Sequence, residues 1–382
     1  MSFKKNIKKR LKWIYFSTLN FFSGKKYIVN RTHSKVAQIQ TLKQVNYSHD
    51  FNDSDYLNRQ KLMPNWQQNP EMSSEAFLEI YSNVYIDLTY GVAVDMNLNV
   101  ITQSLKNPEM KLDTEFFKVS PYREYEGPVI LINGALNARY FHAWFDGILK
   151  LYYLSKHQSQ RITILIYATA PPLYHWILDK FQNQFDYEII TDCRFVKVKH
   201  YWLIKGVYFA KHAPYISKEI THFFKETLVS NLSLLRDKKI FIKRKSSDRD
   251  ILNQTALEAL FVTAGYELIQ LEDLSFQEQI DYFYRATHVA GLHGAGFTNL
   301  LFCQPGTYVL ELQNYAAVTT YYMISKQLGL HYQYIFPIEF DFSKIVDPYL
   351  KSKKYYYQKL LPVSFSKEEV IEELNKYTTY LN

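Results

Sequence analysis

The strongest chemical signal in the sequence is a glycine-rich turn around residue 293, placed between a predicted strand and a predicted helix. Glycines let the backbone approach an anion closely, and the free N–H groups at a helix start point toward that anion. The His293 side chain can donate to a phosphate oxygen. The turn therefore predicts a phosphate site, although a tight turn without a ligand would have the same residues. The residues assigned to this site are His293, Gly294, Ala295, Gly296, Thr298 and Asn299.

A second signal is a run of basic residues directly after a predicted strand at residues 240–242. Arg244, Lys245 and Arg249 lie in this run, and arginine can form two parallel hydrogen bonds to a phosphate. The carboxyl ends of parallel strands meet at one edge of a sheet, so we expect this run close to the glycine-rich turn. The alternative is a solvated basic turn.

A third signal is the pair His142 and Asp146, four residues apart on one face of a predicted helix. A carboxylate in this position can take a proton from an acceptor hydroxyl, and a neighbouring histidine can orient it. The alternative is an ordinary hydrogen-bonded pair within a helix.

Alternating elements in the second half of the chain are expected to position these groups. Apolar runs predict strands, and the segments between them have helical patterns with Asn253 and Ser275 as N-caps. This alternation predicts a parallel sheet with helices on both faces, which binds ligands at the carboxyl ends of its strands. The predicted strands are 240–242, 266–271, 288–291, 308–312 and 332–336, and the predicted helices are 254–263, 276–285, 295–302 and 318–328.

The first half of the chain alternates less clearly. Residues 51–125 contain short strand-like runs, at 84–86 and 92–100, that favour hairpins. Beyond Pro128 we expect strands at 129–132, 162–167, 187–190 and 202–209, and helices at 140–156, 171–181 and 217–235. Two alternating halves predict an α/β fold with two Rossmann-like domains facing a cleft, the arrangement called GT-B. The expected division is a basic arm at 1–50, a first α/β domain at 51–235, a second Rossmann-like domain at 236–340, and an extension at 341–382 whose helix, 367–380, packs across the body.

Charge and composition limit the partners and the compartment. The net charge is +8, but no acidic residue precedes Asp50, and this opening stretch holds eleven Lys and Arg residues. The rest of the chain has 34 basic residues against 37 acidic ones, which argues against nucleic acid as a partner. Residues 1–26 could instead rest on an anionic membrane surface as an amphipathic helix, and a packed or disordered arm is the alternative. Two cysteines and no long apolar segment suit a cytoplasmic protein, peripheral on the inner face of the membrane.

Together the three signals resemble glycosyltransferase family 61, which includes plant xylan arabinosyl- and xylosyltransferases and animal O-linked GlcNAc transferases. The order and spacing agree over residues 128–313. Two departures concern Lys245, where the family often has a second arginine, and the lack of a proline after Asp146. The residues that carry the resemblance are His142, Asp146, Arg244, Arg249, Asn253, Ser275, Phe276, Gln277, Glu278, Gln279, His293, Gly294, Ala295, Gly296, Thr298, Asn299, Phe302, Pro305, Gly306 and Glu311.

The resemblance implies a GT-B fold, inversion at the sugar C1 and no required metal or cofactor, the nucleotide-sugar being a co-substrate. It also implies that Asp146 is the base, that residues 51–235 form the acceptor-side domain, and that residues 236–340 form the nucleotide-sugar-binding domain. Glu311 ends the strand after the turn, where acidic residues bind a ribose hydroxyl in nucleotide folds. We therefore expect transfer of a sugar, from a UDP-sugar, to a glycan hydroxyl in the synthesis of surface polysaccharide such as capsule. A nucleotide-sugar epimerase and a non-catalytic nucleotide-sugar-binding or scaffold protein are the alternatives.

Overall fold

The structure is a computed structural model that divides into two compact units. It describes residues 30–32, 38–46, 73–101, 119, 122–132, 139–156, 161–168, 170–205, 208–210, 213–214, 216–232, 235–244, 251–313, 320–338 and 363–378. The first unit comprises residues 1–45 and 75–207, and the second comprises residues 46–74 and 208–382. The boundary thus falls at residue 207, earlier in the chain than the expected position at 235, and helix α6 belongs to the second unit.

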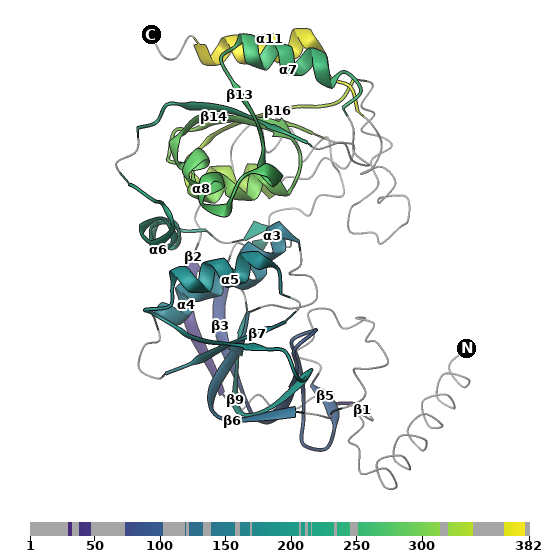
Figure 1. Ribbon diagram of the computed structural model, residues 1–382, viewed down its shortest axis with the longest axis vertical. Helices are drawn as coiled ribbons and strands as arrows, with labels where there is room; N and C mark the ends of the chain where they lie inside the picture. The colour runs from purple at the N-terminus through teal and green to yellow at the C-terminus, as the bar shows by residue number, and fades with distance from the viewer. Residues whose placement is uncertain are drawn as a thin grey trace, which may run out of the picture. The chain divides into compact units, whose positions relative to one another are not determined.

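The first unit is built on a mixed sheet (Figure 1). Strands β9, β6, β7 and β8 pair in parallel in that order, as expected for an α/β fold, but β9 also pairs antiparallel with β3. The β3–β4 pair is the hairpin predicted from the first half of the sequence. The strands are β1 Asn30–Thr32, β2 Gln38–Asn46, β3 Ser73–Asp87, β4 Val92–Val94, β5 Asn99–Ile101, β6 Tyr122–Leu131, β7 Thr163–Tyr167, β8 Asp186–Ile190 and β9 Phe195–Lys205.

The helix expected at 140–156 has an unusual middle section. Its ends are α-helical, as α3 (Tyr140–His142) and α4 (Lys150–Ser155), but Ala143–Ile148 form the π-helix η3. All six residues of η3 are buried. Helix α5 (Pro172–Lys180) follows the next strand and begins with Pro172, whose fixed φ suits a first helical turn.

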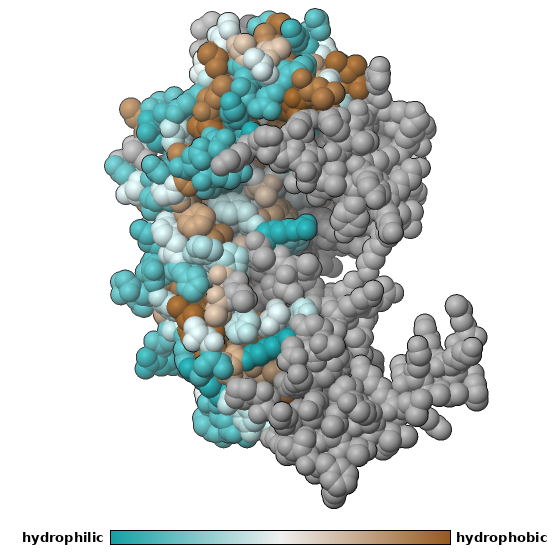
Figure 2. All heavy atoms as spheres, turned by 45° about the vertical axis from the view of Figure 1, so that its right-hand side comes forward, coloured by the Kyte–Doolittle hydropathy of each residue, from teal (hydrophilic) through white to brown (hydrophobic). Residues whose placement is uncertain are grey.

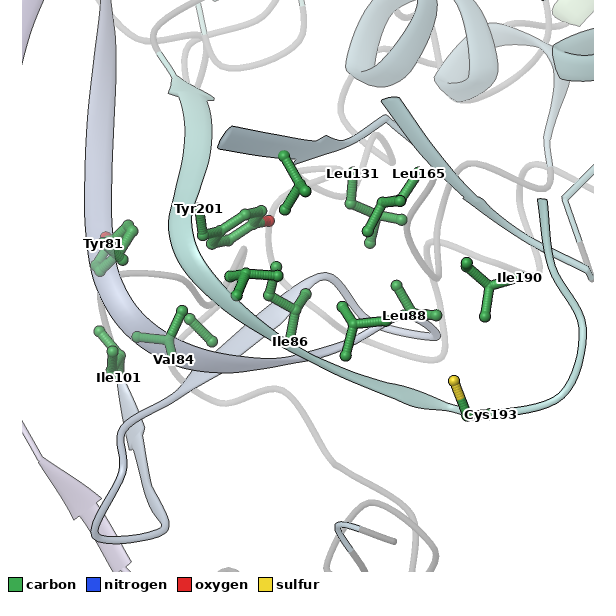
Figure 3. Close-up of a cluster of buried hydrophobic side chains, with 14 residues drawn as sticks. Tyr81, Val84, Ile86, Leu88, Ile101, Leu131, Leu165, Ile190, Cys193 and Tyr201 are labelled. Carbon is green, nitrogen blue, oxygen red and sulfur yellow. The ribbon is translucent and has the colours of Figure 1, made fainter. Parts of the chain in front are cut away.

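A hydrophobic cluster occupies the core of the first sheet (Figure 3). Side chains from β3, β6, β7 and β9 converge there, including Tyr81, Ile86, Leu131, Leu165 and Tyr201. Burying each such side chain stabilises the fold by about 1.5–3 kcal/mol. Cys193 lies in this cluster, and Cys303 is buried in the second unit, where burial raises the pKa of its thiol to about 12. Both cysteines are therefore core residues.

The second unit contains a five-stranded sheet in the order β13-β12-β14-β15-β16, and every pairing in it is parallel. This arrangement is the doubly wound sheet predicted from the second half of the sequence. The strand order reverses between β12 and β14, which makes their carboxyl ends a topological switch point. The strands are β12 Lys238–Lys243, β13 Glu267–Gln270, β14 Ala286–Leu292, β15 Tyr308–Leu312 and β16 His331–Ile335, and a separate antiparallel pair is formed by β10 Tyr208–Ala210 and β11 Ala213–Pro214.

Helices of the second unit follow the predicted positions closely. Ser275 caps α8 in a full capping box with Glu278, as its sequence position predicts. Helix α6 is shorter than expected and ends at Leu228, after which Val229 is extended. Residues 295–302 form a 3₁₀ helix, where an ordinary helix was expected. The helices are α6 Lys218–Leu228, α7 Gln254–Thr263, η4 Leu271–Asp273, α8 Phe276–Arg285, η5 Ala295–Phe302, α9 Thr320–Leu328 and α11 Lys367–Thr378.

The C-terminal helix α11 packs beside α7 and completes the second core (Figure 1). Asn253 was expected to cap α7, but its side chain makes no capping hydrogen bond. Its Nδ2 instead donates to the Phe365 carbonyl oxygen at 2.7 Å, and its Oδ1 accepts from the Phe365 N–H at 3.3 Å. Both polar groups of the amide are used to hold the segment that leads into α11, which prevents Asn253 from capping.

The surface shows apolar side chains around α7 and α11 as well as charged ones (Figure 2). Leu252 and Val262 keep 70% and 54% of their surface exposed, and Ile371 keeps 42%. Exposed apolar residues of this kind are common on soluble proteins. No helix within the described ranges is both long and apolar enough to span a bilayer.

Candidate functional site

Arg244 directly follows β12, and its guanidinium lies on the glycine-rich turn after β14. Its Nη2 donates to the His293 carbonyl oxygen at 2.6 Å. The expectation that strand ends bring the basic run and the turn together is therefore confirmed for these two residues. They meet at the switch point of the sheet, where doubly wound folds bind their ligands.

Gly294 is required by the position of this guanidinium. Its backbone is extended, with φ at 176°, a conformation open to any residue. A Cβ at Gly294, however, would lie 1.9 Å from Arg244 Nη2. Gly296 is similarly close-packed, because a Cβ there would lie 2.7 Å from Leu271 Cδ1. The glycines thus give Arg244 and the sheet room to pack against the turn.

The start of η5 leaves backbone donors beside the guanidinium. The first hydrogen bond of this helix runs from Phe297 N to Gly294 O at 3.1 Å. The N–H groups of Ala295 and Gly296 precede it, so they have no partner within the helix. A guanidinium next to such N–H groups is an arrangement that favours an anionic ligand.

The other end of η5 is held by a half-buried lysine. Lys225, on α6, donates through Nζ to the Cys303 carbonyl oxygen at 2.6 Å. Burial lowers the pKa of this amine to about 8. A cation that bonds to the last carbonyl groups of a helix stabilises that end, so Lys225 helps to fix the turn in place.

Thr298 and Asn299 were expected to face the phosphate site, and both side chains are buried. Asn299 has no exposed surface, and its Nδ2 donates to Gln279 Oε1 at 3.2 Å. Gln279 in turn donates to the Leu271 carbonyl oxygen at 2.9 Å. The 3₁₀ helix is wound more tightly than the α-helix that was expected. Through its hydrogen bond to Gln279, Asn299 joins η5 to α8.

Glu311 lies inside the second unit, where it contacts two other side chains. Its exposed fraction is 0%, and its Oε1 lies 2.5 Å from His293 Nδ1. Its Oε2 accepts from the hydroxyl of Tyr332. Both carboxylate oxygens are therefore used inside the protein, which leaves the expected ribose contact without support in this geometry. Lys245 and Arg249 lie outside the described residues.

His142 and Asp146 form the expected contact in the first unit. His142 Nδ1 lies 3.0 Å from Asp146 Oδ2, and the side chains are 34% and 9% exposed, respectively. Asp146 lies within the π-helix η3, where Leu149 N bonds to Trp144 O at 2.9 Å. π-Helical turns are rare in proteins, and those that do occur often lie at functional sites. The partly exposed histidine over a buried carboxylate is an arrangement suited to proton transfer.

Gly147 allows a tyrosine to pack against this π-helix. A Cβ at Gly147 would lie 2.2 Å from the Tyr174 hydroxyl oxygen, and that hydroxyl donates to Ala143 O at 3.3 Å. Tyr174 comes from α5 and is fully buried. The contact supports the wide turn that carries Asp146.

A family comparison covers both of these regions. The family model described as Glycosyltransferase 61 matches residues 140–310. This segment is therefore similar to the glycosyltransferase 61 family. The match contains His142, Asp146, Arg244 and the 293–296 turn, and it ends one residue before Glu311.

A curated relative supports the same family. The chain is 33% identical over 100 residues to the EGF domain-specific O-linked N-acetylglucosamine transferase of Gallus gallus. The matched part covers 25% of this chain and 19% of that protein's length. Both findings support a glycosyltransferase. The metal-free reaction implied by the resemblance stays a prediction.

Sequence reasoning missed two tyrosines that contact the candidate site residues or the helix that carries them. Tyr332 was predicted only as a strand residue, and Tyr174 only as part of a helix. A partial signal existed for Tyr332, since it was expected to lie on a strand of the same parallel sheet as Glu311. Their register, which pairs Glu311 with Tyr334 and places Tyr332 on the same face, could not be read from the sequence.

Proposed function

We propose that this chain is an inverting glycosyltransferase that moves a sugar from a UDP-sugar to a glycan hydroxyl in the synthesis of surface polysaccharide. The observation that carries the proposal is the Arg244 guanidinium on the 293–296 turn at the switch point of a parallel sheet. A diphosphate leaving group needs neutralisation of this kind. The glycosyltransferase 61 match and the N-acetylglucosamine transferase name of the relative support transfer of a sugar.

In the proposed reaction, the acceptor oxygen forms a bond to the sugar C1 as the bond from C1 to the diphosphate oxygen breaks. Attack from the face opposite the diphosphate inverts C1. The nucleoside diphosphate leaves with the electron pair, and Arg244 together with the N–H groups of Ala295 and Gly296 stabilises its charge. Removing one preorganised donor of this type costs about 3–4 kcal/mol of transition-state stabilisation in other enzymes.

The acceptor proton goes to the His142–Asp146 pair. The resemblance implies that Asp146 is the base, but the greater exposure of His142 favours a shared role. In that role, His142 Nε2 takes the proton while Asp146 holds Nδ1 and balances the positive charge. We further propose that the two units correspond to the two domains of a GT-B transferase, with the acceptor bound by the first and the nucleotide by the second.

The first experiment asks whether a nucleoside diphosphate binds. UDP, GDP, ADP and TDP would be titrated by calorimetry and by thermal shift, because a ligand that binds the folded state raises its apparent stability. We expect UDP to bind in the micromolar range and Arg244→Ala to weaken it at least tenfold. If none of the four nucleotides binds, the proposed nucleotide site is wrong.

The second experiment tests the proton acceptor. Asp146→Asn and His142→Gln should each lower kcat by about 100-fold to 10,000-fold, the contribution of general-base catalysis. UDP affinity should stay within twofold, because the pair lies in the first unit and the 293–296 turn lies in the second. His175→Gln, a histidine on α5, is the matched control. Near-normal turnover in both variants would remove the pair from catalysis, and turnover lost only in Asp146→Asn would return the base role to Asp146.

Product analysis separates the competing functions. NMR of the product should show an inverted anomeric centre. Conversion of the free UDP-sugar without any acceptor would indicate an epimerase. UDP-sugar binding without transfer to any acceptor extract would indicate a binding protein.

A further inference from the structure

Three buried side chains link neighbouring strands next to the glycine-rich turn at residues 293–296. His293 follows β14, Glu311 lies on β15 and Tyr332 lies on β16. Glu311 bonds to His293 through Oε1 and to the Tyr332 hydroxyl through Oε2. Gln313 extends the network, since its Nε2 donates to the Tyr332 hydroxyl oxygen at 3.2 Å.

A buried carboxylate such as Glu311 contributes little net stability to a sheet. An ionised carboxylate without exposed surface costs several kcal/mol of desolvation, which partners offset only when the geometry is good. Well-packed apolar residues often serve stability equally well at such positions. Packing alone therefore does not explain Glu311, and the contact to His293 suggests what the carboxylate does.

The contact fixes the orientation of the His293 ring. Because Nδ1 faces Glu311, ring geometry directs Nε2 away from it. Tyr321 packs against the ring, with centroids 5.4 Å apart. The His293 side chain is 9% exposed, and its Nε2 makes no hydrogen bond to any residue that the structure describes. The carbonyl oxygen of the same residue accepts from Arg244, so this buried imidazole belongs to the turn that holds the guanidinium.

We propose that Glu311 and Tyr332 are positioning residues that hold His293 so that Nε2 donates to the diphosphate of the nucleotide-sugar. The proposal rests on the proposed function and names a further group that recognises the leaving group. In the proposed complex the Nδ1–H group donates to Glu311 and the Nε2–H group donates to the diphosphate, so the carboxylate balances the charge of the doubly protonated ring. Tyr332 donates to the second carboxylate oxygen and keeps Glu311 in place.

The binding test uses UDP and the full chain. Glu311→Gln keeps the side-chain shape and removes the charge, and we expect it to weaken UDP binding at least tenfold in calorimetry. Tyr332→Phe should weaken UDP binding two- to fivefold. Tyr308→Phe is the matched control, because it removes one hydroxyl from the adjacent strand on the other face of the sheet. Its UDP affinity should equal that of the wild type.

A spectroscopic test reports what a merely structural role would not change. In protein labelled with ¹⁵N-histidine, the signals of His293 would be assigned by their loss in His293→Gln. We expect a protonated Nδ1 in the free protein, a changed Nδ1 shift in Glu311→Gln, and a shift of Nε2 on UDP addition. The buried His288, at the other end of β14, serves as the unchanged reference in the same spectrum.

The outcomes separate this proposal from the proposed function. If the wild type binds UDP but Glu311→Gln binds it equally and Nδ1 is unaltered, the positioning role is wrong and the nucleotide site stands. If UDP and other nucleoside diphosphates do not bind, the proposed function fails, and an unprotonated Nδ1 would still overturn the positioning role. If Glu311→Gln does not fold, the wild-type protein still tests the proposal. A His293 Nε2 chemical shift that does not change when UDP binds would overturn it.

Discussion

Single atoms decide where the charged groups of this site lie. The Arg244 guanidinium occupies the space that a side chain at Gly294 would need. That the two meet could be predicted, because the carboxyl ends of neighbouring parallel strands share one edge of the sheet. The Glu311–Tyr332 contact could not be predicted, because it depends on strand register. The burial of Asn299 depends on the local winding of η5, which the sequence pattern does not reveal.

Gly294→Ala should displace the guanidinium without unfolding the protein, because the clash is with the end of a flexible side chain. A hydrogen bond to a charged group contributes about 1.5–3 kcal/mol, so we expect UDP affinity to fall about 10- to 100-fold. Calorimetry measures the loss, and circular dichroism checks the fold. Gly127→Ala is the control, since a Cβ there meets nothing within 4 Å. Unchanged UDP binding in Gly294→Ala would show that Arg244 does not need its present position.

Among the elements, regular strands and helices follow the sequence well, and irregular helices do not. Helices α7 and α8 begin and end where the pattern predicts. The π-helix η3 and the 3₁₀ helix η5 escape prediction because hydrophobic spacing does not distinguish a helix with 3.6 residues per turn from its wider and tighter forms. Asn253 has the sequence position of an N-cap, but a segment more than 100 residues later in the chain competes for its amide.

Asn253→Ala should destabilise the second unit by about 1–3 kcal/mol, because two hydrogen bonds to the Phe365 backbone are lost and polar groups remain unpaired. Urea denaturation monitored by circular dichroism measures the change. Thr263→Ala removes an exposed hydroxyl near the end of the same helix and should change the free energy of unfolding by less than about 0.5 kcal/mol. Equal stabilities for the two variants would contradict the structural role of Asn253.

At the scale of the whole molecule, the proposed chemistry is shared between the two units. The His142–Asp146 pair belongs to the first unit and the 293–296 turn to the second. The sequence predicts the parallel sheet of the second unit, since apolar runs alternate with helical patterns throughout it. It predicts the first unit less well, because strand β9 pairs with β6 on one side and with the distant hairpin strand β3 on the other.

Global stability should depend on pH through His288, at the amino end of β14. Its ring stacks on Tyr308 at 5.1 Å, and burial lowers its pKa to about 4 from an ordinary value of 6.5. The unfolded chain therefore binds the proton more readily than the folded one. This group's contribution is complete above pH 6.5 and is lost as pH falls toward 4, on the order of 3 kcal/mol in total.

The measurement is urea denaturation at several pH values between 7 and 4. His288→Phe retains an aromatic ring against Tyr308 but cannot take a proton, so its stability should fall less than that of the wild type over this range. Parallel pH curves for the two proteins would rule out His288 as the cause.

Helix α11 and the segment that leads into it contribute side chains to the second core, which affects how the chain folds during synthesis. Val363, Phe365, Val370 and Leu374 pack among side chains from β12, β14 and β15. A ribosome releases the first unit and the 293–296 turn well before it releases these residues. The second core can close only when they emerge, so a nascent chain that stops short of residue 363 would expose the apolar face of its parallel sheet to chaperones and proteases.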